Sequence, residues 1–234
     1  VYKRQKHVHE KEEEFLYLRR TPQQAELICS SPLMWPWSPL NNDLQTHYAP
    51  FKMSQIAGMY EVGNAGAYTD TGLPIRPAQM SGVLGNVVTM ARTRGFSSPN
   101  TSIIILDEYQ KEESDYYRRG EGVGLANIYE TVNRNRELQG KKPVTLLCMS
   151  NAVGMANPYY MQWDITDTVE KMLGKKERVK LLKDKGILLI DLVDSPVAKE
   201  KANTALYRSM SGTDFYRSAI ENQYSAEEKS LVVS

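Results

Sequence analysis

The chain has 234 residues, enough to bury a sizeable core in one large α/β domain, or in one domain and a fragment of another. Its composition is ordinary for a globular protein, and its formal net charge of +1 gives no global sign of nucleic-acid or membrane binding. Two cysteines, Cys29 and Cys148, exclude a disulfide framework, and the sequence has no zinc signature. We therefore expect a reduced, cytoplasmic setting, and no apolar run approaches the roughly 18 residues of a membrane span.

The N-terminal residues 1–15 (VYKRQKHVHEKEEEF) form a charged segment, which we interpret as the tail of a helix that leads into a strand. The chain begins with Val1 and not with Met. Residues 229–234 (KSLVVS) look like the first residues of another strand. We therefore expect both ends of the sequence to be cut.

The first element that the sequence predicts is a strand. Residues 14–19 (EFLYLR) have the apolar density of a buried strand. Thr21 and Pro22 follow, and they fit an N-cap residue and a proline at the first helical position. We expect a short helix from there to about Ile28.

The next third of the sequence is less regular. Residues 31–100 are rich in Pro, Gly, Asn and Ser, which predicts short strands and loops. Within this region we expect residues 31–79 to form an irregular insert. Residues 101–106, in contrast, contain a continuous aliphatic run that predicts a buried strand.

A helix and a further strand follow. Residues 121–139 predict a helix, because apolar side chains recur on one face at i, i+3, i+4 and i+7. Gly140 ends this helix, and residues 143–149 (PVTLLCM) form a second wholly apolar strand. Strand, crossover helix and strand make a βαβ unit, and strands that are apolar on both faces imply a parallel sheet covered by helices. The stripe on the helix consists of Leu125, Ile128, Tyr129 and Val132.

The remaining residues continue the same alternation. Residues 177–185 predict a helix, residues 186–193 (GILLIDLV) a further buried strand, and residues 196–210 another helix. The predicted fold class of the whole chain is α/β.

Two acids, Asp107 and Glu108, directly follow the aliphatic run. In an open parallel sheet, ligands bind beyond the carboxyl ends of the strands. A carboxylate pair there suits a Mg²⁺-nucleotide, because the first acid can hold the metal's hydration shell and the second can direct the attacking water, as in a Walker B motif. Ser150 and Asn151 end the next predicted strand, where a polar side chain can reach the γ-phosphate. The alternative is that the acids only face solvent or cap a helix.

A phosphate loop of the form G-x-x-x-x-G-K-[ST] normally accompanies this motif, and the sequence does not contain one. Residues 140–142 (GKK) and 174–176 (GKK) lack both the earlier Gly and the Ser or Thr. Either the chain is no P-loop enzyme, or the loop precedes Val1. The order of elements favours the second alternative, since the charged start lies where the helix after a phosphate loop would end.

A set of stretches along the chain carries a resemblance to one family: FLYLRR (15–20), TSIIILDEY with KEE (101–113), IYETVNRNRE (128–137), CMSNAVGMANPYY (148–160) and SGTDFYRSAIENQY (211–224). Together they resemble the DNA-encapsidation ATPases of short-tailed phages, which are terminase-like motors that package double-stranded DNA into a prohead. TVNRNRE followed at short distance by MSNAVGMANPYY is the most specific part. The resemblance covers about residues 14–30 and 80–224, and residues 31–79 have no clear match.

The resemblance implies a P-loop NTPase core of the ASCE (RecA-like) type, with a parallel sheet and flanking helices, truncated before its phosphate loop. Residues 1–212 would be this core, and residues 213–234 would begin a linker to a missing nuclease-like domain. The implied cofactors are ATP and Mg²⁺. The implied partners are double-stranded DNA, the phage portal or prohead and a homo-oligomeric ring of the same subunit, without a membrane, in the cytoplasm of the infected bacterium.

The resemblance also implies residue roles. Asp107 would be the Mg²⁺ acid, Glu108 the catalytic acid, and Ser150 and Asn151 would stand at the γ-phosphate-sensing position. Arg134 would be an arginine finger that enters the site of a neighbouring subunit.

Helix geometry agrees with an outward Arg134. This residue lies nine positions after Leu125, or about 180° around a helix of 3.6 residues per turn, so it points away from its own core. Arg136 comes round beside the apolar stripe, where we expect it to snorkel or to pair with an acid. Without the resemblance, plain solvation would explain an outward arginine.

Arg19 and Arg20 end the first strand, on the same edge of the sheet as the acids. We predict that they are nucleotide-binding residues, and the alternative is that they form a solvated or salt-bridged pair. The expected function is ATP hydrolysis coupled to the translocation of double-stranded DNA. A different P-loop ATPase, such as a helicase, and a non-enzymatic α/β binding module are the other hypotheses.

Overall fold

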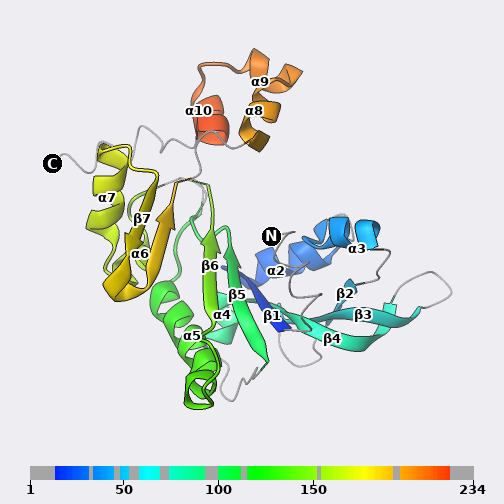
Figure 1. The fold of residues 1–234 in the computed structure, drawn as a ribbon. Helices are drawn as coiled ribbons and strands as arrows, with labels where there is room; N and C mark the ends of the chain where they lie inside the picture. The colour runs from blue at the N-terminus through cyan, green and yellow to red at the C-terminus, as the bar shows by residue number, and fades with distance from the viewer. Residues whose placement is uncertain are drawn as a thin grey trace. The chain divides into compact units, whose positions relative to one another are not determined.

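The computed structural model describes most of the chain, and Figure 1 shows its helices and strands. The chain divides into two compact units, which are described separately: Val1–Tyr109 with Arg118–Met149, and Gln110–Tyr117 with Ser150–Ser234. The described residues are 14–31, 34–44, 48–52, 58–68, 74–92, 100–111, 115–151, 154–191 and 196–221. The helix tail predicted before residue 14 and the strand start predicted at 229–234 lie outside these ranges.

The first unit is built on a six-stranded sheet with the order β2-β3-β4-β1-β5-β6. The four strands β4, β1, β5 and β6 are parallel to one another, and β2 and β3 join them in an antiparallel arrangement. The fold is therefore α/β with a mostly parallel sheet. The strands are β1 (Glu14–Arg19), β2 (Tyr48–Lys52), β3 (Tyr60–Tyr68), β4 (Pro74–Asn86), β5 (Thr101–Asp107) and β6 (Thr145–Met149).

The predicted βαβ unit is confirmed. Helix α5 (Glu121–Leu138) connects β5 to β6, and the two strands pair in parallel. Gly140 ends the helix with a φ of 69°, a left-handed conformation that glycine adopts at little cost. The predicted stripe faces the core, because Leu125, Ile128 and Val132 are buried.

The prediction that β6 is buried like β5 is wrong. β5 is almost wholly buried, whereas β6 consists of exposed and half-buried residues. The reason lies in the strand order, since among the described strands β6 is the edge strand of the sheet and has a neighbour on one side only. An apolar run alone does not reveal an edge position.

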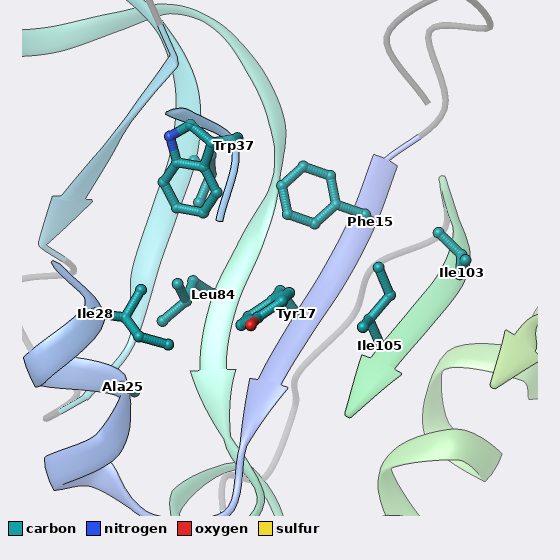
Figure 2. Packing of buried hydrophobic residues seen from close by; sticks show 9 residues of the cluster. Phe15, Tyr17, Ala25, Ile28, Trp37, Leu84, Ile103 and Ile105 are labelled. Atoms are coloured by element: carbon teal, nitrogen blue, oxygen red, sulfur yellow. The ribbon is translucent and has the colours of Figure 1, made fainter. Parts of the chain in front are cut away.

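The core lies on both sides of β1 and β5. On one face, Phe15 and Tyr17 of β1 pack beside Ile103 and Ile105 of β5 (Figure 2). Alternate residues point to the other face and are fully buried as well, so both faces are covered, as the apolar runs predict. Each fully buried aliphatic side chain contributes about 1.5–3 kcal/mol to stability. The second face carries Leu16, Leu18, Ile104 and Leu106.

Helix α2 (Pro22–Cys29) covers the first of these faces, with Ala25 and Ile28 buried in the cluster. The predicted helix start is confirmed. The Thr21 side chain accepts a hydrogen bond from the Gln24 backbone N–H, and the Gln24 side chain accepts one from the Thr21 backbone N–H, which is a capping box.

Residues 31–79 are more regular than predicted. They contain α3 (Ser38–Leu44), β2, β3 and the start of β4, and the described part of this region extends the sheet. Strands are confirmed in this region, but β3 with 9 residues and β4 with 13 are longer than the predicted short strands. The pairing of β3 with β4 shifts register several times after Val62, which accommodates the Gly- and Asn-rich sequence within a sheet. A short helix, α4 (Val87–Met90), follows β4.

In its described residues, the second unit consists of short helices and one hairpin. Its helices are α6 (Pro158–Gln162), α7 (Thr166–Gly174), α8 (Pro196–Ala202), α9 (Ala205–Ser209) and α10 (Asp214–Glu221). The single helix predicted over residues 196–210 is therefore two helices, separated at Asn203 and Thr204. No helix in the described part of the chain is both long and apolar enough to cross a membrane.

The helix predicted over residues 177–185 is wrong. The segment forms β7 (Val179–Leu182) and the 3-10 turn η2 (Lys183–Lys185), and β8 (Ile187–Ile190) returns antiparallel to β7. The aliphatic residues Val179, Leu181 and Leu182 fit a period of two as well as one of 3.6, and Gly186, in a left-handed conformation (φ 64°), lies at the turn between the two strands. The second strand is half exposed in this hairpin and does not join the parallel sheet.

Candidate functional site

The candidate site lies where the parallel strands β1 and β5 end. Leu18 of β1 is in register with Leu106 of β5, so the next residues, Arg19 and Asp107, lie side by side at the carboxyl ends of the strands. Because side chains alternate along a strand, Tyr17 and Arg19 share a face of β1. On this face, the apolar cluster around Tyr17 is therefore followed by the polar side chains of Arg19 and Asp107 at the ends of the strands.

Asp107 is held by two donors from β1. The Tyr17 hydroxyl donates to Oδ2 of Asp107 at 2.5 Å, and Nη1 of Arg19 forms an ion pair with the same oxygen at 3.0 Å. Nη2 of Arg19 contacts Oε2 of Glu108. A single, nearly buried guanidinium therefore bridges both acids of the predicted pair.

Exposure increases from β1 towards the acids. The side chain of Arg19 is 11% exposed, that of Asp107 25% and that of Glu108 53%. Burial of the Tyr17 ring, reinforced by the negative charge of Asp107, raises the pKa of Tyr17 far above its ordinary value, although Arg19 opposes this shift. The Tyr17 hydroxyl therefore stays protonated and remains a donor to Asp107.

Glu108 has an unusual backbone conformation. Its φ of 53° lies in the left-handed region, which costs a non-glycine residue about 1–3 kcal/mol and is enriched at functional sites. The turn at Glu108 ends β5. The next residue continues the pairing with β6, since the Tyr109 N–H donates to the Met149 carbonyl at 3.3 Å.

The two carboxylates at this edge of the sheet, Asp107 and Glu108, suit a magnesium ion that is also bound by phosphate. Among the described residues, Oδ1 of Asp107 and Oε1 of Glu108 have no hydrogen-bond or ion-pair partner. Mg²⁺ is commonly held by one or two carboxylates together with water and phosphate oxygens, so two partly exposed acids are sufficient. Nε of Arg19 is buried without a partner in the described structure, which leaves one donor beside the acids for a further acceptor.

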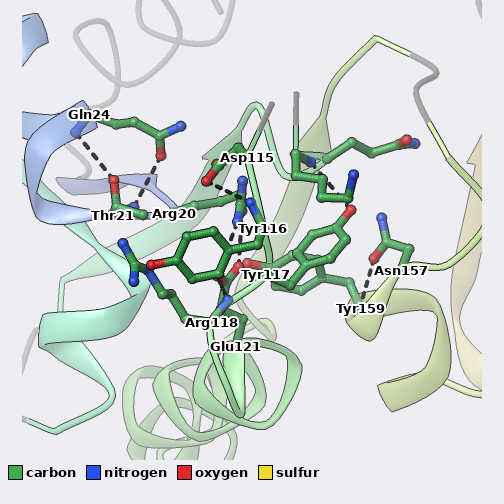
Figure 3. A network of polar contacts seen from close by, with 12 residues as sticks. Arg20, Thr21, Gln24, Asp115, Tyr116, Tyr117, Arg118, Glu121, Asn157 and Tyr159 are labelled. Atoms are coloured by element: carbon green, nitrogen blue, oxygen red, sulfur yellow. Dashed lines mark hydrogen bonds and ion pairs between the residues drawn. The ribbon is translucent and has the colours of Figure 1, made fainter. Parts of the chain in front are cut away.

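Arg20 forms a separate, fully buried ion pair (Figure 3). Its Nε lies 2.9 Å from Oε2 of Glu121 and its Nη2 lies 3.1 Å from Oε1. Oε1 of Glu121 also accepts the backbone N–H of Arg118 at 2.5 Å, before the first turn of α5. These contacts support the salt-bridged alternative for Arg20, and they do not support nucleotide binding by this residue.

Arg134 lies on the outer face of α5. Its side chain is 61% exposed, and its ion pair with Glu130, one turn earlier, is loose at 3.9 Å. The predicted outward orientation is confirmed. Arg136 is half-buried, and its Nε donates to the Lys142 carbonyl at 3.2 Å.

Ser150 and Asn151 begin the part of the chain that belongs to the second unit. Ser150 follows Met149, which is in register with Asp107, but the convergence of both strand ends on one ligand stays a prediction. Oγ of Ser150 accepts the Gln110 backbone N–H at 3.3 Å. Asn151 is exposed.

The structure adds two residues that the sequence analysis missed, Tyr17 and Gln110. The buried Gln110 side chain donates to the Tyr160 hydroxyl at 3.0 Å and accepts the Gly154 N–H at 3.0 Å, so it organises the segment after β6. Tyr17 had a signal in the sequence, because it lies two positions before Arg19 on one face of a strand. Gln110 had none beyond its position after the acids.

Comparison with known proteins places the chain in a family. The family described as Podovirus DNA encapsidation protein (Gp16) matches residues 84–234, which is more than half of the chain. The DNA packaging protein of Bacillus phage phi29 is 32% identical over 127 residues, which cover 54% of this chain and 34% of that protein. The aligned part thus spans about a third of the relative.

Two solved structures share the fold. The crystal structure of the N-terminal domain of the DNA packaging ATPase from bacteriophage phi29 superposes with a TM-score of 0.50 at 20% identity, covering 77% of this chain and 75% of that one. The bacteriophage phi29 viral genome packaging motor assembly gives a TM-score of 0.52 at 16% identity, covering 92% and 56%. Because the family match over residues 84–234 covers more than half of the sequence, the chain belongs to the Podovirus DNA encapsidation protein family.

Proposed function

We propose that this chain is part of the ATPase subunit of a viral DNA-packaging motor, which couples ATP hydrolysis to the translocation of double-stranded DNA into a prohead. The observation that carries the proposal is the position of Asp107 and Glu108. Both acids follow a buried central strand and are tied to the neighbouring parallel strand by Arg19. Family membership supports a packaging motor over the helicase and binding-module alternatives.

At a finer level, we propose a P-loop core of the ASCE type within residues 1–212, with residues 213–234 leading towards a further domain. The parallel order β4-β1-β5-β6 and the acids at the end of β5 support this core. The full-length protein would supply the phosphate loop. Its ring of subunits, portal contact and DNA contact are parts of the same proposal.

In the proposed mechanism, Asp107 would hold a magnesium ion, for which its oxygen Oδ1 is free among the described residues. When bound, the ion would neutralise charge on the phosphates. Glu108 is the more exposed acid, and it would orient the attacking water and accept its proton while the bond from the γ-phosphorus to the bridging oxygen breaks and ADP leaves. Ser150 and Asn151 would contact the γ-phosphate or the same water.

Two arginines complete the proposal. Arg19 keeps both acids in place, and its unpartnered Nε is the candidate contact to nucleotide. Arg134 reaches the site of a neighbouring subunit, where a guanidinium would stabilise the charge that develops on the transferred phosphoryl group. Its exposure and its loose ion pair leave it available for this role.

The test is Glu108→Gln in the full-length protein. This change keeps the shape of the side chain and removes the base, so DNA-stimulated ATP hydrolysis is expected to fall by about 10²–10⁴-fold while Mg-ATP binding persists. Glu170→Gln, at an exposed glutamate of α7, is the matched control and should retain activity. Unchanged hydrolysis in Glu108→Gln would remove Glu108 from the mechanism.

The alternatives make different predictions for the intact protein. A binding module would not bind Mg-ATP at all. A helicase would separate the strands of a DNA duplex, whereas a packaging ATPase would move intact duplex into proheads. An assay of DNA protection inside proheads, run beside a strand-separation assay, distinguishes the two ATPases.

A further inference from the structure

We propose that Tyr17 is a positioning residue for the metal-holding acid: its hydroxyl, together with Arg19, occupies Oδ2 of Asp107 and thereby presents Oδ1 to the ion. This inference rests on the proposed function of Asp107. It concerns a residue that does not itself touch metal or nucleotide. It also predicts which oxygen of Asp107 faces the ligand.

The first argument is the convergence of two donors on one oxygen. Tyr17 Oη lies 2.5 Å from Oδ2 of Asp107, and Arg19 Nη1 lies 3.0 Å from the same atom. Oδ1 receives no hydrogen bond from the described residues. Two donors of different direction fix the rotation of a carboxylate, which a single donor does not.

The second argument is the rigidity of Tyr17. Its ring is 1% exposed and belongs to the apolar cluster with Phe15, Ile103 and Ile105 (Figure 2). The ring therefore cannot follow movements of the acid. Arg19, in contrast, is shared between Asp107 and Glu108, so its position depends on both acids.

The third argument is the competition for Arg19. If Glu108 moves to direct water, its contact with Arg19 changes, and the bond between Arg19 and Asp107 changes with it. The Tyr17 hydroxyl holds Asp107 independently of Glu108. Tyr17 thus separates the positioning of the metal-holding acid from the movement of the water-directing acid.

The test is Tyr17→Phe in the full-length protein, with Tyr129→Phe as the matched control. Tyr129 lies in the same unit, and its hydroxyl donates to the Val144 carbonyl at 3.1 Å, so the control removes a comparable structural bond. Binding of Mn²⁺ in the presence of ADP is measured by electron paramagnetic resonance. The ATPase rate is then measured against Mg²⁺ concentration, and melting temperatures confirm that both variants fold.

We expect Tyr17→Phe to weaken Mn²⁺ binding by about 10-fold or more and to raise the Mg²⁺ concentration for half-maximal activity by the same factor, the effect typical of outer-shell changes at metal sites. Saturating Mg²⁺ should restore kcat, and Tyr129→Phe should match the wild type. Wild-type Mn²⁺ affinity in Tyr17→Phe would overturn the inference, and so would a loss of kcat that Mg²⁺ does not restore. A wild-type protein that binds no Mn²⁺ with ADP would instead overturn the proposed function.

Discussion

Arg20 and Glu121 form a buried ion pair that joins the end of β1 to the start of α5, and the two side chains are 0% and 1% exposed. Removal of one partner would leave an uncompensated charge in the core, which costs about 3–5 kcal/mol. We therefore expect Glu121→Gln to lower the free energy of unfolding by about this amount, as measured by urea denaturation.

The control for this prediction is the exposed pair of Lys185 and Asp164, whose side chains are 40% and 97% exposed. Exposed pairs contribute about 0–1 kcal/mol, so Asp164→Asn should leave the urea midpoint almost unchanged. The double variant Arg20→Met with Glu121→Leu removes both charges and should recover most of the stability that Glu121→Gln loses. Equal losses in Glu121→Gln and Asp164→Asn would show that burial does not determine the energy of the first pair.

Gly82 allows β1 and β4 to approach closely. A Cβ atom at this position would lie 2.3 Å from the Phe15 carbonyl oxygen, which belongs to the backbone and cannot rotate away. Gly82→Ala should therefore destabilise the protein by about 1–3 kcal/mol or more. Gly174 is the matched control, since a Cβ there meets no atom within 4 Å and the residue ends α7, so Gly174→Ala should be neutral or stabilise by about 0.5–1 kcal/mol. Thermal melting of both variants checks the contrast.

Arg134 should be needed for hydrolysis but not for stability. Its ion pair with Glu130 is exposed and contributes about 0.3–0.5 kcal/mol, so Arg134→Ala should melt like the wild type. Because Arg134 is proposed as an arginine finger, Arg134→Ala should also reduce the ATPase rate by about 10³-fold or more. Arg119→Ala, which removes another exposed arginine of this unit, should retain the full rate.

Mixed rings test whether Arg134 acts on a neighbouring subunit. Arg134→Ala subunits keep Glu108, and Glu108→Gln subunits keep Arg134. If the arginine acts in trans, a mixture of the two inactive variants should regain part of the ATPase activity, because some interfaces combine both intact residues. No recovery at any mixing ratio would argue for action within one subunit.

Cys29 should react slowly with alkylating reagents. It ends α2 and packs against the core cluster, and burial raises the pKa of its thiol from 9.0 to about 12. Because the folded state holds the proton more tightly, the contribution to stability is complete below pH 9 and is lost as the pH rises towards 12. In a Cys148→Ser background, the rate of iodoacetamide labelling should rise from pH 7 to pH 10 without levelling off. A plateau near pH 9 would contradict the burial of the thiol.

The most accurate sequence predictions concern elements whose signals are local. The apolar runs of β1 and β5, the capping residues of α2 and the stripe of α5 predicted these elements almost to the residue. The hairpin of β7 and β8 was missed because a short charged and aliphatic segment fits two periods. The order of strands was not predictable, so the exposure of β6 was not predictable either.

The sequence by itself determined the fold class, the acids at the end of a buried strand and the outward direction of Arg134, because each depends on spacing within one segment. Only the tertiary structure decided which charge each arginine meets. Arg19 contacts Asp107 at a separation of 88 residues, and Arg20 contacts Glu121 at a separation of 101. Arg19 is the last residue of β1 and Arg20 follows the strand, so two neighbouring arginines with the same chemistry have different partners. Those partners are set by the pairing of β1 with β5 and by the position of α5, which no local pattern encodes.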